Sequence, residues 1–324
     1  MVFEYATEGP HGQQATSLGT LYVPPGLAPS GGWPVVSYGH GTQGLGDKNI
    51  SYPHWVGEDN TGDQYLSAWL NAGFAVAATE YVGLGTEGDH PYLNSHSEGA
   101  AMIDAVRAAR SVSGDLSTTF VTNGYSQGGQ ASIAAGAMAA DYAPELTLAA
   151  TTTGGVPAGV ADELSAVSPA LQIAQPDLAT YLAFTLAGFR AVDPSFPLDN
   201  YLTEAGRSAV EAAQELNYFE MSAMLNDVPI GTLVTQPLGV GPLIGELRKS
   251  VTVPATGWGA PAFIYQQSLD VVSPAAFTTA LVADARLNGA DVTYRLDHEL
   301  AGHVGWDTAL DEAIDFSLSK VSTS

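Results

Sequence analysis

Three residues far apart in the chain have the types and the order needed for nucleophilic catalysis: Ser126, Asp270 and His303. A serine hydroxyl is a weak nucleophile at neutral pH and becomes reactive when a histidine removes its proton. A carboxylate then orients the histidine and stabilises its charged form. The order serine, acid, histidine is known from enzymes in which each residue follows a strand of one sheet. These residues therefore predict acyl transfer through a covalent intermediate on Ser126.

Ser126 is the centre of the pentad Gly124-Tyr125-Ser126-Gln127-Gly128, which has the form G-x-S-x-G. A strand-like run (119–123) precedes the pentad and a helical run of small residues (130–140) follows it. In that setting the serine lies in a tight, strained turn with φ above zero, and the glycines let strand and helix approach. Because the chain contains 36 glycines, the pentad alone is weak evidence, and its strand-to-helix setting carries the prediction.

Only His298 and His303 follow Ser126 in the chain and can supply the base. His303 lies in the glycine-flanked segment Ala301-Gly-His-Val-Gly305, after an expected strand and before the last expected helix. His298 lies between two acids near the strand end, which is more typical of a surface or supporting histidine. We therefore predict that His303 is the base.

The acid is predicted to be Asp270, which comes just after the strand-like run that begins at residue 263. An aspartate at this place can also be an ordinary helix cap. Its position before His303, with one helix between them, favours the catalytic role. Asp297 and Asp284 are weaker candidates, because the first is adjacent to His298 and the second lies within an expected helix.

An acyl-transfer site also needs two donors for the oxyanion. One is expected to be the backbone N–H of Gln127, directly after the nucleophile. The other is expected from the loop Gly39-His40-Gly41-Thr42, where we choose Thr42, through its N–H, its hydroxyl or both. His40 is then expected to brace the loop and not to act as a second base.

The elements that must position these residues alternate between β and α. This alternation predicts a mostly parallel sheet with helices on both faces. Expected strands are 16–23, 33–38, 74–79, 119–123, 146–153, 262–266 and 292–296; expected helices are 64–71, 97–112, 130–140, 274–288 and 308–318.

The alternation stops between residues 156 and 253, where several helical segments are separated by prolines. The pattern resumes afterwards, so we predict one hydrolytic core, 1–155 and 254–324, interrupted by an inserted helical cap, 156–253. An unrelated second domain is the alternative. Two apolar cap segments, 181–186 and 230–244, suit either a hydrophobic substrate or the packing of the cap itself.

Composition excludes several classes of function. The net charge of −24 arises from 34 acidic but only 10 basic residues, which argues against nucleic acid or an anionic membrane as partner. There is no cysteine, hence no disulfide, thiolate metal site or cysteine nucleophile. No apolar run reaches the roughly 18 residues of a spanning helix, so integral membrane association is not expected. A signal peptide is absent or already removed, and secretion and a cytoplasmic location both stay open.

No metal or cofactor is expected. The histidines outside the predicted site lack the spacing of metal ligands, and the segment Gly88-Asp89-His90-Pro91 is more typical of a turn. No nucleotide-binding fingerprint follows a strand. These histidines are His11, His54, His90 and His96.

Several segments together resemble the secretory lipase family of α/β-hydrolases, which includes the fungal lipase A type. They are Val35-Val-Ser-Tyr-Gly-His-Gly-Thr42, Val76-Ala-Ala-Thr-Glu-Tyr-Val-Gly-Leu-Gly85, His90-Pro-Tyr-Leu93, Gly99-Ala-Ala-Met-Ile-Asp-Ala-Val-Arg-Ala-Ala109, Gly124-Tyr-Ser-Gln-Gly-Gly129, Asp270 and Gly302-His303. The resemblance implies an α/β-hydrolase fold and a Ser-Asp-His esterase or lipase with a helical cap over its acyl pocket. The similarity extends over about residues 20 to 310, the cap excepted.

Three departures from the family pattern bear on the site. The usual Asp-Tyr-Glu-Gly-Leu-Gly is Glu80-Tyr-Val-Gly-Leu-Gly85 here, and the disulfides of fungal members have no counterpart. Thr42 stands where the fungal type has an acidic oxyanion residue, so the oxyanion hole is expected to be built differently.

The sequence as a whole predicts a cofactor-independent serine carboxylic ester hydrolase whose partners are small-molecule, lipid or polymeric esters, and export is the expected location. Peptidase, acyltransferase and polyester depolymerase are alternatives, since the same triad serves all of them. A non-catalytic binding protein of this fold is a further alternative. Acyl-chain length, alcohol group and oligomeric state are left open.

Overall fold

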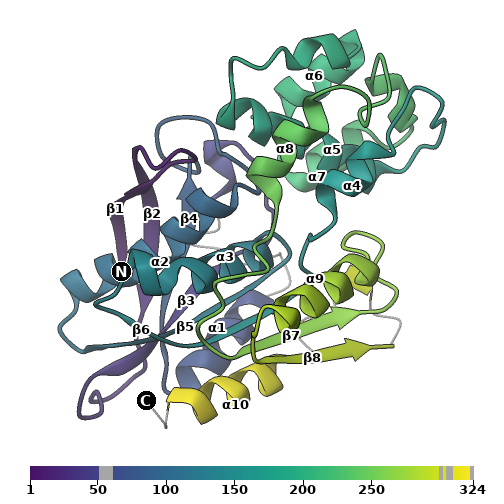
Figure 1. Cartoon of the computed structure of the whole chain (residues 1–324). Helices are drawn as coiled ribbons and strands as arrows, with labels where there is room; N and C mark the ends of the chain where they lie inside the picture. The colour runs from purple at the N-terminus through teal and green to yellow at the C-terminus, as the bar shows by residue number, and fades with distance from the viewer. Residues whose placement is uncertain (51–60, 299–301, 304–308, 322–324) are drawn as a thin grey trace.

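The computed structural model of the chain describes residues 1–50, 61–298, 302–303 and 309–321. Its centre is an eight-stranded sheet with the order β1-β2-β4-β3-β5-β6-β7-β8 (Figure 1). The strands are Val2–Glu8 (β1), Gln14–Tyr22 (β2), Trp33–Gly39 (β3), Ala75–Val82 (β4), Leu116–Tyr125 (β5), Thr147–Gly154 (β6), Ala262–Gln267 (β7) and Val292–Asp297 (β8).

Neighbouring strands from β4 to β8 are parallel, whereas β1 and β2 are antiparallel additions at one edge. The expectation of a mostly parallel sheet is therefore confirmed. Strand β1 is not among the expected strands, although its exposed and less exposed residues alternate regularly along Val2–Glu8. The order β4-β3-β5 puts the ends of β3 and β5 side by side, so the loop after β3 adjoins the pentad after β5.

Helices cover both faces of the sheet, as expected. Two consecutive residues of β3 pack on opposite faces of the sheet. Val35 packs against α2 and α3, whereas Val36 packs against α1 and α10. Helix α9 joins α3 on the first of these faces. The bounds are Thr61–Asn71 (α1), Ser95–Val112 (α2), Gln127–Tyr142 (α3), Ala275–Leu287 (α9) and Leu310–Val321 (α10). Residue 308, where the last helix is predicted to begin, lies outside the described residues.

Between β6 and β7 the chain leaves the sheet and forms a helical layer above it (Figure 1). This layer has its own apolar core, which Tyr92 and Leu93 of the sheet domain join. Its elements are α4 (Val160–Ser165), α5 (Pro176–Val192), η2 (Leu198–Tyr201), α6 (Glu204–Ala212), α7 (Tyr218–Met224), η3 (Ile230–Leu233) and α8 (Leu243–Val251). We call this layer the cap. The division at residues 155/156 and 253/254 into core and cap domains stays a prediction.

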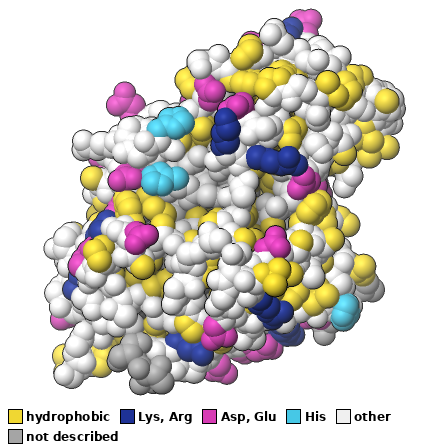
Figure 2. Space-filling view, viewed as in Figure 1, with side chains coloured by type: hydrophobic (Ala, Val, Ile, Leu, Met, Phe, Trp, Pro, Cys, Tyr) yellow, Lys and Arg dark blue, Asp and Glu magenta, His cyan; other side chains and the backbone are white. Residues whose placement is uncertain are grey.

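On the face shown in Figure 2, hydrophobic side chains gather over the cap and basic side chains are few and scattered. Among the exposed apolar residues of the cap are Ile173, Phe219 and Val240. Within the described part of the chain, no helix combines the length and apolarity needed to cross a bilayer.

One glycine of the pentad gives a direct test of how closely helix and sheet approach. A Cβ at Gly128 would lie 1.9 Å from the carbonyl oxygen of Gly39, which is backbone and cannot give way. We expect Gly128→Ala to lower the free energy of unfolding by about 3 kcal/mol or more, measured by urea denaturation. Gly245→Ala is the matched control, because no atom lies within 4 Å of its Cβ position. That exposed helical change should stabilise by about 0.5–1 kcal/mol. Equal unfolding midpoints for the two variants would contradict the close approach.

Candidate active site

The turn from β5 to α3 has the geometry that a nucleophile elbow requires. Ser126 links the two elements with φ 58° and ψ −120°, a strained conformation for a residue with a side chain. Its amide donates to the carbonyl oxygen of Gly154 at 3.0 Å. At Gly124 a Cβ would lie 2.4 Å from the carbonyl oxygen of Gly128, so both glycines of the pentad are sterically required. The expected tight turn is confirmed.

The structure brings together the three residues that sequence reasoning selected. The His303 ring lies between the other two, with Nε2 2.9 Å from Ser126 Oγ and Nδ1 2.8 Å from Asp270 Oδ2. When Nδ1–H donates to the carboxylate, Nε2 is left to accept the serine proton. Of the residues quoted around His303, Ala301, Val304 and Gly305 lie outside the described part of the chain.

Asp270 is a buried carboxylate with several donors. The amides of Val272 and Ser273 donate to its Oδ1 at 2.9 and 2.8 Å, and the Gln266 side chain donates to Oδ2 at 3.2 Å. Helix α9 has Pro274 as its N-cap, so Asp270 is not the cap of that helix. The donors hold the carboxylate in place and leave Oδ2 directed at His303.

The weaker candidates for the base and the acid are exposed or bind other residues. His298 is exposed, and Asp284 is exposed on α9. Asp297 accepts from the Tyr265 hydroxyl at 3.3 Å and from Arg295 at 3.2 Å. His303, by contrast, lies at hydrogen-bond distance from Ser126.

The predicted oxyanion donors belong to the elbow itself and to the loop after β3. Gln127 is the first residue of α3, so its amide has no partner within the helix. The loop after β3 passes close to the elbow, because the Cβ position of Gly41 lies 3.8 Å from Ser126 Cβ. The Thr42 hydroxyl is 2.7 Å from the Tyr92 hydroxyl. This pair ties the loop to a wall of the pocket described below.

His40 is fully buried beneath the loop. Its Nδ1 is 2.7 Å from the Gly41 carbonyl oxygen, and its Nε2 lies 3.7 Å from Glu80 Oε2. The Tyr81 hydroxyl donates to the His40 carbonyl oxygen at 2.9 Å. These contacts agree with the bracing role expected for His40.

Sequence reasoning missed two residues that support the triad. The Tyr125 hydroxyl donates to the His303 carbonyl oxygen, and the two rings pack with centroids 5.2 Å apart. Gln266 is fixed between Thr278 and Asp270. An adjacent pair of glutamines, Gln266 and Gln267, at the end of an apolar strand was the available signal, since buried amides need partners.

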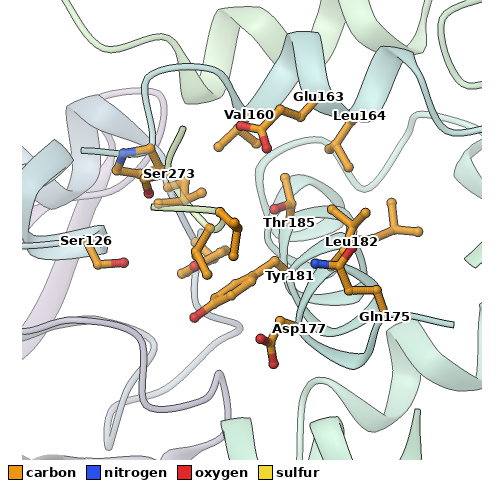
Figure 3. A pocket seen from close by; sticks show the side chains of 16 residues that line it. Ser126, Val160, Glu163, Leu164, Gln175, Asp177, Tyr181, Leu182, Thr185 and Ser273 are labelled. Atoms are coloured by element: carbon orange, nitrogen blue, oxygen red, sulfur yellow. The ribbon is translucent and has the colours of Figure 1, made fainter. Parts of the chain in front are cut away.

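A pocket opens from Ser126 into the cap (Figure 3). Its empty space, including the open mouth, is about 610 Å³. The walls are largely apolar, with Leu164, Tyr181 and Leu182 from the cap and Val271 from the core. Residues 181–186 thus serve both interpretations that the sequence left open, because they line the pocket and also pack into the cap core.

Two acids line this pocket, whereas none of the described residues that line it is Lys, Arg or His. Glu163 and Asp177 lie on opposite sides of the cavity in Figure 3. Burial, and to a smaller extent the charge of Asp270, raises the pKa of Glu163 to about 7. Asp177 accepts a hydrogen bond from the Tyr218 hydroxyl at 2.6 Å.

Two curated relatives match by sequence. Lipase A of Moesziomyces aphidis is 23% identical over 248 residues, covering 69% of this chain and 49% of the relative. The secreted triacylglycerol lipase LIP5 of Malassezia furfur is 25% identical over 189 residues, covering 56% and 44%. The chain therefore spans about half the length of the curated relatives it matches.

Solved structures match over nearly the whole chain. The rice cell wall degrading esterase LipA of Xanthomonas oryzae superposes with a TM-score of 0.77 at 22% identity, covering 98% of this chain and 88% of that one. Candida antarctica lipase A gives 0.77 at 18% identity, covering 98% and 77%. A putative hydrolase of Legionella pneumophila gives 0.78 at 20% identity, covering 98% and 87%. The fold is the α/β-hydrolase fold.

The family model for secretory lipases matches residues 60–309, which is more than half of the chain and includes Ser126, Asp270 and His303. The resemblance that the sequence motifs indicated is confirmed, and the chain belongs to the secretory lipase family.

Proposed function

We propose that this protein is a serine carboxylic ester hydrolase that cleaves hydrophobic acyl esters through an acyl-enzyme on Ser126. The observation that carries the proposal is the continuous contact from Ser126 Oγ through the His303 ring to Asp270, at the mouth of a largely apolar pocket. Membership of the secretory lipase family supports the same reaction class.

In the proposed mechanism, His303 Nε2 takes the hydroxyl proton as Ser126 Oγ attacks the ester carbonyl carbon. Asp270, held by its amide donors, stabilises the imidazolium that forms. The imidazolium then gives its proton to the leaving alcohol, and the acyl group stays on Ser126. Water, deprotonated by the same histidine, attacks the acyl-enzyme and releases the carboxylic acid.

The amides of Gln127 and Thr42 are the proposed donors to the oxyanion. A donor at the first turn of α3 also gains from the positive end of the helix dipole. The Thr42 hydroxyl is already paired with Tyr92, and we assign it the task of holding the loop.

Esters are favoured over amides because the family and the named relatives are lipases and esterases. A series of p-nitrophenyl esters compared with p-nitroanilides and a polyester separates the alternatives of peptidase and depolymerase. Cleavage of amides without cleavage of esters would overturn the proposal. Secretion belongs to the proposal as well, and its support is the family and a relative described as secreted.

The first prediction about the reaction concerns the nucleophile. Ser126→Ala should abolish ester hydrolysis and labelling by a fluorophosphonate probe, since Ser126 Oγ is the proposed nucleophile. Ser132→Ala is the matched control, because Ser132 is a buried serine on the same helix. This control should keep both activities, and circular dichroism checks the fold of each variant. Labelling of the Ser126→Ala protein would refute the assignment.

The second prediction concerns the acid. Asp270→Asn should lower kcat by roughly a thousandfold or more, because the amide stabilises the wrong histidine tautomer. Asp297→Asn is the control, since Asp297 contacts Tyr265 and Arg295 instead. Steady-state kinetics with p-nitrophenyl butyrate measures both. Equal losses in the two variants would contradict the choice of Asp270.

The third prediction concerns the charge of the pocket. At pH 8.5 Glu163 is ionised and should repel a substrate that carries its own carboxylate. The kcat/KM for p-nitrophenyl hexanoate should therefore be about tenfold higher than that for the p-nitrophenyl monoester of adipic acid. The ratio should fall at pH 6, where Glu163 is protonated while the distal carboxylate of the substrate stays charged.

Glu163→Gln should give the low ratio at both pH values. Glu215→Gln, an exposed acid of the cap, serves as the control and should behave like the unsubstituted protein. A ratio that is unaffected by Glu163→Gln would remove Glu163 from the binding of substrate.

A further inference from the structure

Three polar side chains with almost no solvent exposure meet beneath the elbow: Gln127, His90 and Glu98. Gln127 Nε2 lies 2.8 Å from His90 Nε2 and 2.8 Å from Glu98 Oε1. Gln127 carries the proposed oxyanion amide on its backbone, but its side chain points away from the pocket into this cluster. The proposed mechanism gives the cluster no task. Burying three polar groups is costly unless each proton has an acceptor, so their protonation can be worked out.

His90 must be neutral and must carry its proton on Nδ1. Nδ1 is 2.7 Å from the carbonyl oxygen of Val82, which can only accept. Nε2 faces the Gln127 amide nitrogen, which can only donate. A proton on both ring nitrogens would leave two donors opposed. Burial agrees with this, since it lowers the pKa of His90 to about 3.

Glu98 has one satisfied oxygen and one that is not. Oε1 accepts from the Gln127 side chain at 2.8 Å and from the Leu93 amide at 2.9 Å. Oε2 is buried, and the described structure offers it no hydrogen-bond partner. A negative charge on that oxygen would be buried with nothing to stabilise it. A proton on Oε2 would also lack an acceptor, but burying an unpaired neutral hydroxyl costs much less than burying an unpaired charge. We therefore assign Glu98 as a neutral carboxylic acid.

Glu98 is connected to the substrate pocket by its hydrogen bond with the amide of Leu93, which lines the pocket. Leu93 has φ 58°, a strained conformation for a branched residue, and its amide is held by Glu98. Its carbonyl oxygen accepts from the Gln130 side chain at 2.6 Å. Leu93 and Tyr92 line the pocket, and Tyr92 contacts Thr42. The cluster thus connects the elbow, one wall of the pocket and the oxyanion loop.

We propose that Glu98 and His90 are positioning residues, which must both be uncharged to hold Gln127 and Leu93 in place and so keep the Gln127 amide aimed at the oxyanion. This inference rests on the proposed ester hydrolase function. It assigns a task to the segment His90-Pro-Tyr-Leu93 and to the start of α2, which the triad leaves unexplained.

Raising the pH should disable this arrangement. Burial raises the pKa of Glu98 to about 8, against the opposing effect of the bonds from Gln127 and Leu93. Above that pH a buried negative charge appears beneath the oxyanion hole, where it disfavours the negative charge of the transition state.

Among the described residues, no neighbouring charge compensates that of an ionised Glu98. The titratable groups facing it are His90, Tyr81 and Tyr92. His90 is neutral, and burial raises the pKa of both tyrosines above their ordinary value, so they are neutral near pH 8 as well. Beyond Tyr81 lies the pair of His40 and Glu80.

The fourth prediction compares two substitutions of Glu98. Glu98→Leu removes both accepted hydrogen bonds and should lower kcat at pH 7 by about a hundredfold, comparable with loss of one oxyanion donor. Glu98→Gln keeps the accepting oxygen without ionising. It should recover most of that loss and should abolish the fall of kcat above pH 8 that we expect for the unsubstituted enzyme. Glu215→Gln should retain the fall. The measurements are kcat and KM for p-nitrophenyl butyrate from pH 5 to 10.

Two results would overturn the inference: an unchanged alkaline fall in Glu98→Gln, or full kcat in Glu98→Leu. Should the leucine variant fail to fold, the glutamine variant alone decides. Unfolding gives a readout that does not depend on activity. The folded protein keeps a proton that the unfolded chain loses near pH 4.5, so Glu98 makes stability decline as pH rises from there to about 8.

Glu98→Gln should flatten that decline in urea midpoints. If the protein hydrolyses no ester but the decline is flattened, the proposed function fails while the protonation of Glu98 stands. If esters are hydrolysed but Glu98→Gln changes neither the decline of stability with pH nor the fall of kcat above pH 8, only the positioning role fails.

Discussion

The contact on which the rest of this structure depends is the backbone approach between β3 and the start of α3. The carbonyl oxygen of Gly39 occupies the place where a side chain at Gly128 would begin. Ser126 lies two residues before Gly128 and has a positive φ, and the parallel strands on either side of β5 hold the turn in this strained conformation. The serine hydroxyl and the first amides of α3 then face the same space. A looser approach would separate the nucleophile from the donors that its reaction needs.

The order of the strands brings the other residues of the site to the elbow. Strand β7 is separated from β5 only by β6, and β8 is next to β7, so loops after these strands reach the elbow. Asp270 arrives after β7 and His303 after β8. Parallel strands end at one edge of the sheet, and ligands bind there in open α/β sheets. Residues 177 positions apart, Ser126 and His303, thus meet at hydrogen-bond distance.

The sequence predicted the parts of the site whose signals are local. The pentad Gly124–Gly128, the short segment after the expected strand 262–266 and the glycine beside His303 each indicate a turn at the end of a strand. The cluster of His90, Glu98 and Gln127 gave no such signal. Its members come from the β4–α2 loop and from helices α2 and α3, and His90 resembled an ordinary turn residue. Polar contacts of this kind become visible only after packing has brought the elements together, and they were missed for that reason.

The buried acids point to one constraint on how this protein works. With 34 acidic and only 10 basic residues, the chain has few cations to pair with carboxylates that enter its interior. Glu98 at the elbow and Glu163 in the pocket are two such carboxylates. Burial raises the pKa of both toward or above neutrality. An acid without a cation nearby stays neutral at low cost only while the pH is below its pKa. Such a site is therefore best ordered in neutral to mildly acidic surroundings. As the pH rises, the oxyanion hole is disordered first, because Glu98, the more deeply buried of the two acids, lies beneath it.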